Sequence, residues 1–180
     1  MNIYSLKTPL NNIEMLRTGD KVLLSGKLLT ARDQAHRRIA DLINKRTKLP
    51  IDLNNTGIYY TGPIIDLKTG LFTSAGPTTS ARMDKYTSMM LQAGVKFFIG
   101  KGNRNEETTK LIAGHKALYF STIGGAGALL AKCIVSTKII AFPDLGTEAV
   151  YEIEVIDFPC YVAIDSHGNN IFDYNKQINI

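Results

Sequence analysis

The sequence lacks the long apolar segments of membrane and exported proteins. No run of 18 apolar residues occurs in its 180 positions, so we expect no transmembrane helix. The first residues, MNIYSLKTPL, do not place a basic region before an apolar stretch, as a secretory signal would. We therefore expect a cytoplasmic protein with no membrane partner.

Cysteine is scarce as well. Only Cys133 and Cys160 occur, 27 positions apart, and neither belongs to a CxxC motif. A disulfide between them is not expected in a reducing compartment. Two isolated thiols cannot complete a zinc or iron–sulfur site, which normally takes three or four ligands. We expect no metal site in this chain, so any cluster has to be held mainly by another polypeptide.

The excess of positive charge is small and dispersed. The net charge is +5 and the pI is near 9.2. Proteins that bind nucleic acid cluster Lys and Arg with interleaved aromatic residues. Only the segments 37–38 and 45–48 approach such a cluster, and they lie on a helix whose sequence pattern is amphipathic. We therefore expect no nucleic-acid partner. The length and the ordinary apolar content of 44% fit a single domain, 1–180, with a short N-terminal strand region, 1–18.

Helices and strands alternate in the middle of the chain. Between Thr78 and Lys132 this alternation favours parallel pairing of the strands. The two ends contribute further strands, which need not join that sheet. We expect an α/β fold: a three-layer, swivelling-type domain with a mixed sheet and an additional β-rich part. The expected strands are 19–29, 57–65, 71–74, 95–100, 117–122, 137–142, 149–158 and 160–165, and the expected helices are 30–48, 84–92, 105–113 and 124–134.

The first candidate motif, TARDQAH, follows the first long strand. Thr30 is expected to cap the helix, with Asp33 in its first turn. Arg32 and His36 are four residues apart and share a helix face. An arginine at this edge of a sheet can bind a carboxylate through two parallel hydrogen bonds, and a histidine can act as general acid or base. The alternative is that Arg32 pairs with Asp33 or another acid on the surface and that His36 is a partly buried helix residue.

The second motif, GPTTSARMD, is a tight turn that leads into a helix. Free backbone N–H groups at a helix N-terminus favour an anion. Thr78, Thr79 and Ser80 add hydroxyl donors, and Arg82 adds a fixed positive charge. A simple helix cap would explain one hydroxyl residue, but it does not require three of them beside an arginine.

Two glycine-rich turns follow later strands. In IGKGN, Lys101 stands between two glycines, which let the backbone approach a ligand closely. The turn is not a Walker A loop, because GxxxxGK[ST] is absent, and a solvated turn is the alternative. The segment IGGAGA lacks the GxGxxG spacing, so helix packing explains it better. Together, three turns that follow strands carry Arg32, Arg82 and Lys101, and such converging positive groups suit a small dianion.

These same segments resemble a known family. The strings LSGKLLTARDQAHRRI, YYTGPI, GPTTSARMD, IGKGN, GGAGALLAK and LGTEAVYEIEVIDFPCYVAIDSHGN are similar, in this order, to the β subunit or C-terminal domain of class I fumarate hydratases and L(+)-tartrate dehydratases. The likeness runs from about Gly19 to Asn169. It implies a hydro-lyase that adds water reversibly to fumarate to give S-malate. It also implies a 4Fe–4S cluster held by three cysteines of an α subunit, in an αβ or α2β2 assembly.

The resemblance also implies roles for single residues. It implies that Arg32 and Arg82 bind substrate carboxylates, that Lys101 is a further substrate contact, and that Thr78 is the catalytic base. His36 matches a histidine of the motif, with a less defined catalytic role. Residues 79–81 (Thr79, Ser80 and Ala81) would line the pocket through backbone and hydroxyl groups. Threonine is a weak base in water, so this role requires nearby positive charge or a pocket that excludes water.

Three alternatives stay open from the sequence. The substrate could be L(+)-tartrate, although IGGAGA and EAVYEIEVIDFP favour fumarate. The chain could be a non-catalytic module that binds dicarboxylates with the same basic residues. It could also be a stand-alone isomerase or lyase that uses His36.

Overall fold

The computed structural model describes residues 2–173. Its strands are β1 (Ile3–Lys7), β2 (Lys21–Thr30), β3 (Gly57–Tyr59), β4 (Ile64–Ile65), β5 (Phe72–Ser74), β6 (Phe97–Gly100), β7 (Leu118–Ser121), β8 (Ile134–Ala141) and β9 (Val150–Ile164). Its α-helices are α1 (Asp33–Asn44), α2 (Asp84–Gln92), α3 (Glu106–Gly114) and α4 (Gly127–Lys132), and short 3-10 turns cover Ile13–Met15, Ser80–Met83 and Pro143–Glu148. The α/β class is therefore confirmed.

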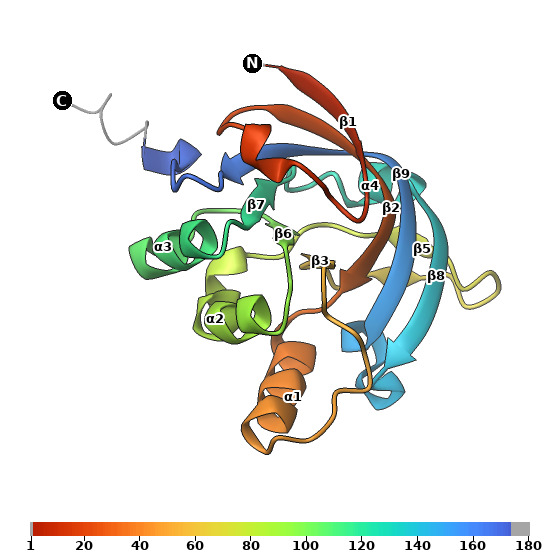
Figure 1. Ribbon diagram of the computed structural model, residues 1–180. Helices are drawn as coiled ribbons and strands as arrows, with labels where there is room; N and C mark the ends of the chain where they lie inside the picture. Colours follow the sequence, from red (N-terminus) through yellow and green to blue (C-terminus); the bar gives the residue numbers. More distant parts are fainter. Residues whose placement is uncertain (1, 174–180) are drawn as a thin grey trace.

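One mixed sheet closes on itself. Its strand order is β1-β2-β3-β6-β7-β9-β8, and β9 also pairs with β2. The strands β2, β3, β6, β7 and β9 thus form a ring, and Figure 1 shows β9 curving across the molecule beside β2. Pairing is parallel from β1 to β7, which includes β6 and β7 in the middle segment where the alternation of elements predicted it, and antiparallel along β9. The strands at both ends of the chain join this sheet, and β4 and β5 form a separate two-stranded sheet.

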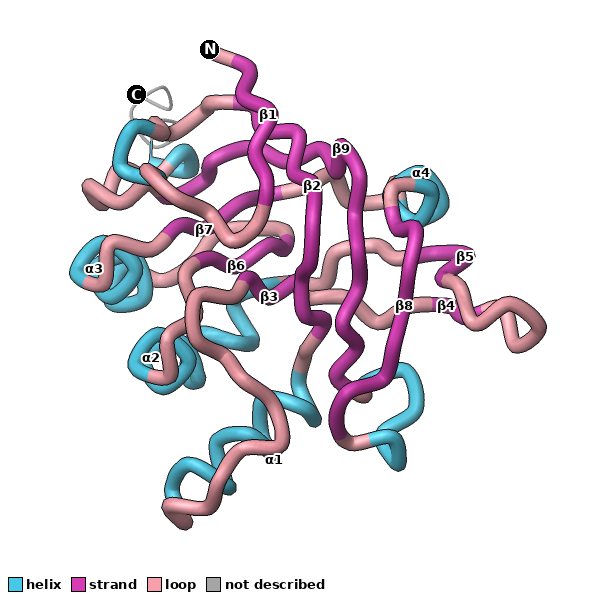
Figure 2. Tube along the Cα trace, turned by 45° about the vertical axis from the view of Figure 1, so that its right-hand side comes forward, coloured by secondary structure: helices cyan, strands magenta, loops and turns pink. Residues whose placement is uncertain are grey.

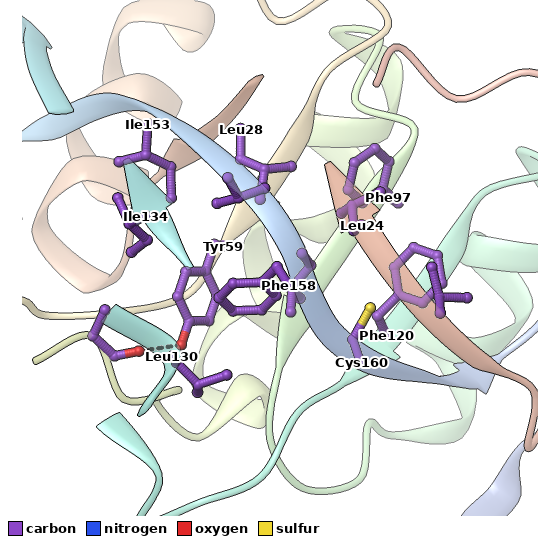
Figure 3. Close-up of a cluster of buried hydrophobic side chains, with 14 of the residues drawn as sticks. Leu24, Leu28, Tyr59, Phe97, Phe120, Leu130, Ile134, Ile153, Phe158 and Cys160 are labelled. Carbon is purple, nitrogen blue, oxygen red and sulfur yellow. Dashed lines mark hydrogen bonds between the residues drawn. The ribbon is translucent and has the colours of Figure 1, made fainter. Parts of the chain in front are cut away.

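Two apolar cores lie on the two faces of the strands, because successive side chains of a strand point to opposite faces. Tyr59, Phe97 and Phe120 point into the ring and pack with Phe158 of β9 (Figure 3). The Tyr59 hydroxyl donates a hydrogen bond to the Ala75 carbonyl there. Alternate residues, such as Phe98, belong to the outer core.

Helices cover the outer face of the strands. In both views α1, α2 and α3 lie together on one side, whereas α4 lies on the other side with β4 and β5 (Figure 2). Ile39 of α1, Met90 of α2 and Ile112 of α3 are fully buried in the outer core. Leu130 of α4 closes the inner core. This arrangement leaves the segments that follow β2, β3, β6 and β7 at one edge of the sheet.

Two expected boundaries were wrong at the first helix. Thr30 does not cap α1; it is the last residue of β2, where its Oγ1 accepts a hydrogen bond from the Tyr151 amide at 3.3 Å. Arg32 stands at the cap position without a side-chain cap. The helix ends at Asn44 rather than near Lys48, and Arg46 then adopts a left-handed backbone with φ of 53°.

The last strand was expected as two strands and is one. Pro159 does not interrupt β9, which continues to Ile164. A shift in the β2–β9 register falls between Leu24 and Gly26 of β2, and Asp157 there adopts a positive φ of 49°. The irregularity bends the pair locally without ending it. One long strand can therefore pair with β8, β2 and β7 and close the ring.

Candidate functional site

Four parallel strands end at the same edge of the sheet. Their register aligns the residues near their carboxyl ends: Thr30, Tyr59, Ile99 and Phe120. Parallel strands run in the same direction, so the segments that follow them leave from one edge, where α/β proteins commonly bind ligands. The sheet topology thus places 31–33, 60–62, 101–103 and 122–125 next to one another.

The GPTTS turn inserts among these segments. The Thr78 amide donates to the Tyr60 carbonyl at 2.8 Å, and the Lys101 amide donates to the Thr78 carbonyl at 3.3 Å. The Ser80 amide then donates to the Lys101 carbonyl at 3.0 Å. Thr79 and Lys101 form a short parallel bridge. The backbone therefore holds Thr78 against both the β3 and the β6 loops.

Arg32 crosses the loop after β3. Its Nη2 pairs with Glu148 at 2.9 Å, and its side chain is 28% exposed. A Cβ at Gly62 would lie only 2.3 Å from Nη1 of Arg32, so the glycine makes room for the guanidinium. Glu148 also accepts the Gln34 amide at 2.8 Å. Arg32 is therefore held at the site edge, with Nη1 outside its ion pair.

Arg82 forms a bidentate pair with Asp33. Its Nε and Nη2 donate to the two carboxylate oxygens at 3.1 and 3.0 Å. Burial opposes ionisation of Asp33, but the hydrogen bond and the charge of Arg82 outweigh it and lower the pKa of this carboxyl. The pair joins the first residue of α1 to the turn before α2. Nη1 of Arg82 lies outside this ion pair and can donate to another acceptor.

Lys101 is the positive group of this edge that lacks an acid. It is half-buried, and a Cβ at Gly124 would lie 3.9 Å from its Nζ. Within residues 2–173 it makes no salt bridge, in contrast to Arg32 and Arg82. Its charge is therefore available to an anion.

The Thr78 hydroxyl is half-buried and oriented. Its Oγ1 donates to the Tyr60 carbonyl at 3.1 Å. A hydroxyl has one hydrogen and two lone pairs. Because the hydrogen is directed at a carbonyl, the lone pairs of Thr78 remain for an incoming donor.

The three residues after Thr78 point in different directions. Thr79 is exposed, and Ala81 lines an open groove of about 580 Å³ together with Arg82. Ser80 is fully buried, and its hydroxyl bonds to the Tyr119 hydroxyl at 3.0 Å, facing the interior. The structure thus brings Arg32, Thr78 and Lys101 to one edge but turns the Ser80 side chain inward.

His36 is also turned away from the edge. It is fully buried beside Tyr60 and Tyr86, with ring centroids 5.4 and 5.8 Å apart. Its Nδ1 bonds to the Arg32 carbonyl at 3.0 Å, and since a carbonyl only accepts, Nδ1 carries the hydrogen. Burial, reinforced by the charge of Arg104, lowers the pKa of His36 to about 4. The neutral ring thus holds the backbone of Arg32 in place through this hydrogen bond.

The described residues do not fit a metal cluster as ligands. No group of three or more His, Cys, Asp or Glu side chains between residues 2 and 173 could hold a metal ion. Cys160 lies in the inner core, where burial raises the pKa of its thiol. No helix of this part of the chain is long and apolar enough to cross a membrane.

The sequence did not indicate Glu148 and Gly62, or the pairing of Asp33 with Arg82, which together shape this edge. Glu148 and Asp33 hold the two arginines, and Gly62 makes room for one of them. Glu148 lies 116 positions from its partner, so no local pattern could reveal the pair. The glycine in YYTGP was the only available signal.

Comparison with known proteins decides the family. The family model described as "Fumarase C-terminus" matches residues 2–175. The chain belongs to this family. The chain is similar to the putative L(+)-tartrate dehydratase subunit beta of Methanocaldococcus jannaschii, which is 39% identical over 174 residues, covering 93% of this chain and 89% of the relative. The L(+)-tartrate dehydratase subunit beta of Escherichia coli is 35% identical, covering 96% of this chain and 88% of the relative.

Longer family members match over only part of their length. Fumarate hydratase 2 of Leishmania major is 36% identical over 173 residues, which cover 93% of this chain but 30% of that protein. The chain thus spans about a third of the fumarate hydratases that it resembles and nearly all of the tartrate dehydratase β subunits.

Proposed function

We propose that this chain is the β subunit of an iron–sulfur hydro-lyase that acts on a four-carbon dicarboxylate. The observation that carries the proposal is the convergence of Arg32, Thr78 and Lys101, from three separate loops, at one edge of the sheet. The match to nearly the full length of two β subunits supports a protein that works with an α subunit. The 4Fe–4S cluster belongs to that partner in this proposal, since the described residues offer no ligand set for it. We also propose that residues 1–180 form one domain of the swivelling type.

In this proposal the basic residues bind the substrate. Lys101 and the free Nη1 atoms of Arg32 and Arg82 donate hydrogen bonds to the two carboxylates. An arginine already held by an acid is pre-oriented, so it loses little freedom when substrate binds. Thr79 and Ala81 line the adjoining surface, and Ser80 contributes its backbone amide to the turn.

Proton transfer at carbon falls to Thr78. Its oxygen, as an alkoxide whose own proton has first passed to solvent, accepts the proton that leaves from the carbon beside a carboxylate; in the hydroxyl form the Tyr60 carbonyl orients the group. An alkoxide at Thr78 would lose that hydrogen bond, so the role depends on the positive charge of Lys101 nearby. The same charge stabilises the carboxylate on which negative charge develops. His36 acts as a support for Arg32 rather than as a contact of the substrate.

Fumarate and S-malate are the substrate pair that we propose. L(+)-tartrate is the second candidate, because the relatives that match this chain over most of their length are tartrate dehydratase β subunits. Anaerobic co-expression with the cluster-carrying α subunit, followed by assays on S-malate and on L(+)-tartrate, separates the two. Activity on neither acid would refute the hydro-lyase proposal.

A matched pair of lysine variants tests the site. Lys101→Met should raise KM for the dicarboxylate by at least about tenfold, because a hydrogen bond to a charged group contributes about 1.5–3 kcal/mol. Lys110→Met is the control, since Lys110 lies on α3 and pairs with Glu106 at 2.7 Å. Equal effects of the two changes would contradict the assignment. Titration of the isolated chain with S-malate tests the non-catalytic alternative, which requires tight binding without the α subunit.

A further inference from the structure

Arg104 is a buried cation three residues after Lys101. Its side chain is 0% exposed, and its Nε hydrogen-bonds to Asp84. Its Nη2 donates to the Thr87 hydroxyl at 2.6 Å. The guanidinium lies 5.7 Å from the ring centre of Tyr60 and 5.2 Å from that of Tyr119. This ion pair is enclosed between helices and strands, directly behind the candidate site.

The pair connects two of the loops that carry site residues. Asp84 is the first residue of α2 and follows Arg82 by two positions, and its second carboxylate oxygen accepts the Asn105 amide at 3.0 Å. Asp84 therefore holds the segment that continues from Lys101 by two contacts. The Tyr119 hydroxyl, packed against the guanidinium, bonds to the Gly102 carbonyl at 2.7 Å. The turn that ends in Arg82 and the loop of Lys101 are thus fixed to each other through buried groups.

Aromatic packing connects Arg104 to the third loop, which carries Arg32. The Tyr60 ring lies between Arg104 and His36, whose centroid is 5.4 Å away. The carbonyl of Tyr60 accepts both the amide and the hydroxyl of Thr78. His36 in turn bonds to the Arg32 carbonyl. Arg104 therefore contacts, directly or through the Tyr60 ring, the residues that hold each loop with a proposed substrate contact.

Stability alone gives a poor reason for this arrangement. A buried ion pair costs much desolvation, and replacement of both partners by apolar residues is often neutral or stabilising. Nη1 of Arg104 also makes no hydrogen bond of standard geometry with the described residues. Resting on the proposed function, we propose that Asp84 and Arg104 are positioning residues, which set the placement of Thr78 and Arg82 relative to Lys101.

The decisive variant removes both charges. Asp84→Leu combined with Arg104→Met should keep the fold, with Tm within a few degrees of the parent, because no unpaired charge is left buried. In the αβ complex its kcat/KM should fall about 100-fold, mainly through KM, because a displacement of about 1 Å in a binding group can have this effect. Arg104→Lys keeps a charge near Asp84 and should recover part of this loss. Equal kcat and KM in the double variant and the parent would overturn the proposal.

Ile112→Ala is the matched structural control. Ile112 is fully buried on α3 and belongs to the outer core, so its truncation lowers Tm without altering the ion pair. We expect its kcat and KM to stay at parent values. If KM rose in proportion to the loss of Tm in both variants, the role of Arg104 would be structural only, and the proposal would be overturned.

Amide hydrogen exchange separates this proposal from the proposed function. In the complex, exchange in 76–83 and 99–103 should be faster in the double variant than in the parent, and unchanged in Ile112→Ala. This result can be obtained even if the parent complex has no hydro-lyase activity, in which case only the proposed function fails. If the double variant does not fold, Arg104→Lys carries the test, because a single ammonium cannot reproduce the contacts that Asp84 and Thr87 make with two separate guanidinium nitrogens. Unchanged exchange and unchanged KM in that variant would overturn the positioning role.

Discussion

Gly62 leaves no room for a side chain beside the Arg32 guanidinium. A Cβ at this position would lie 2.3 Å from Nη1 and 2.8 Å from Cζ, whereas ordinary contact begins at 3.4 Å. The guanidinium must therefore retreat by about 1 Å in Gly62→Ala. Gly62 does not have a positive φ, so the alanine backbone itself fits. Only the arginine has to move.

The expected loss is large for activity and small for stability. A displacement of about 1 Å in a group that binds substrate can reduce kcat/KM about 100-fold. The ion pair with Glu148 is partly exposed, so its disturbance costs about 1 kcal/mol or less. Steady-state kinetics of the αβ complex on S-malate, with a urea denaturation curve of the same protein, measure both quantities.

A second glycine provides the control. Gly114 ends α3, and a Cβ there meets nothing within 4 Å. Gly114→Ala should leave kcat and KM unchanged. Parent-like kinetics in Gly62→Ala, with Arg32 in its original place in a crystal structure, would show that Gly62 is not required to make room for the guanidinium. A drop in stability of several kcal/mol would instead show that Gly62 serves the fold.

Three further predictions follow from single contacts. Thr78→Ala should lower kcat by orders of magnitude while the complex still assembles, as measured by kinetics and size-exclusion chromatography; a kcat near that of the parent would exclude it as the base. Tyr119→Phe should lower the free energy of unfolding by about 1–3 kcal/mol in a urea titration, because the Gly102 carbonyl and the Ser80 hydroxyl lose a buried partner. Burial lowers the pKa of His36 from 6.5 to about 4, so the unfolded chain binds its proton first as pH falls, and about 3 kcal/mol of stability is lost between pH 6.5 and 4. His36→Gln should flatten this dependence in urea titrations at several pH values, and a slope as steep as that of the parent would assign the effect to other groups.

The meeting of the loops after β2 and β6 could be predicted, because it follows from chain order. Strands that alternate with helices pair in parallel, and the turns after them then share an edge. Arg32 and Lys101 follow two such strands, β2 and β6, whereas Thr78 follows β5 of the separate two-stranded sheet and is brought to the edge by its backbone hydrogen bond to Tyr60. The structure confirmed the parallel pairing expected in the middle of the chain, between β6 and β7, and extends it to β2 and β3.

The orientation of side chains at that edge could not be predicted. Ser80 turns inward because Tyr119, 39 positions later, supplies its hydrogen-bond partner. His36 is buried because Tyr60 and Tyr86 enclose it, although Arg32 shares its helix face at the level of sequence. Closure of the ring depends on β9, whose pairing with β2 spans most of the chain. Long-range contacts of this kind have no local signature.

The charge balance at the edge gives a physical reason for the partner of the proposed function. Arg32, Arg82 and Lys101 supply three positive charges, and Glu148 and Asp33 neutralise two of them. A dicarboxylate carries two negative charges, so the edge as described can match only half of the ligand's charge. The two acids thus fix the direction of the arginine side chains, but they also reduce the net positive charge that attracts the dicarboxylate. In the proposed function the missing positive charge comes from the α subunit and its iron, so tight binding and turnover both require the assembled complex.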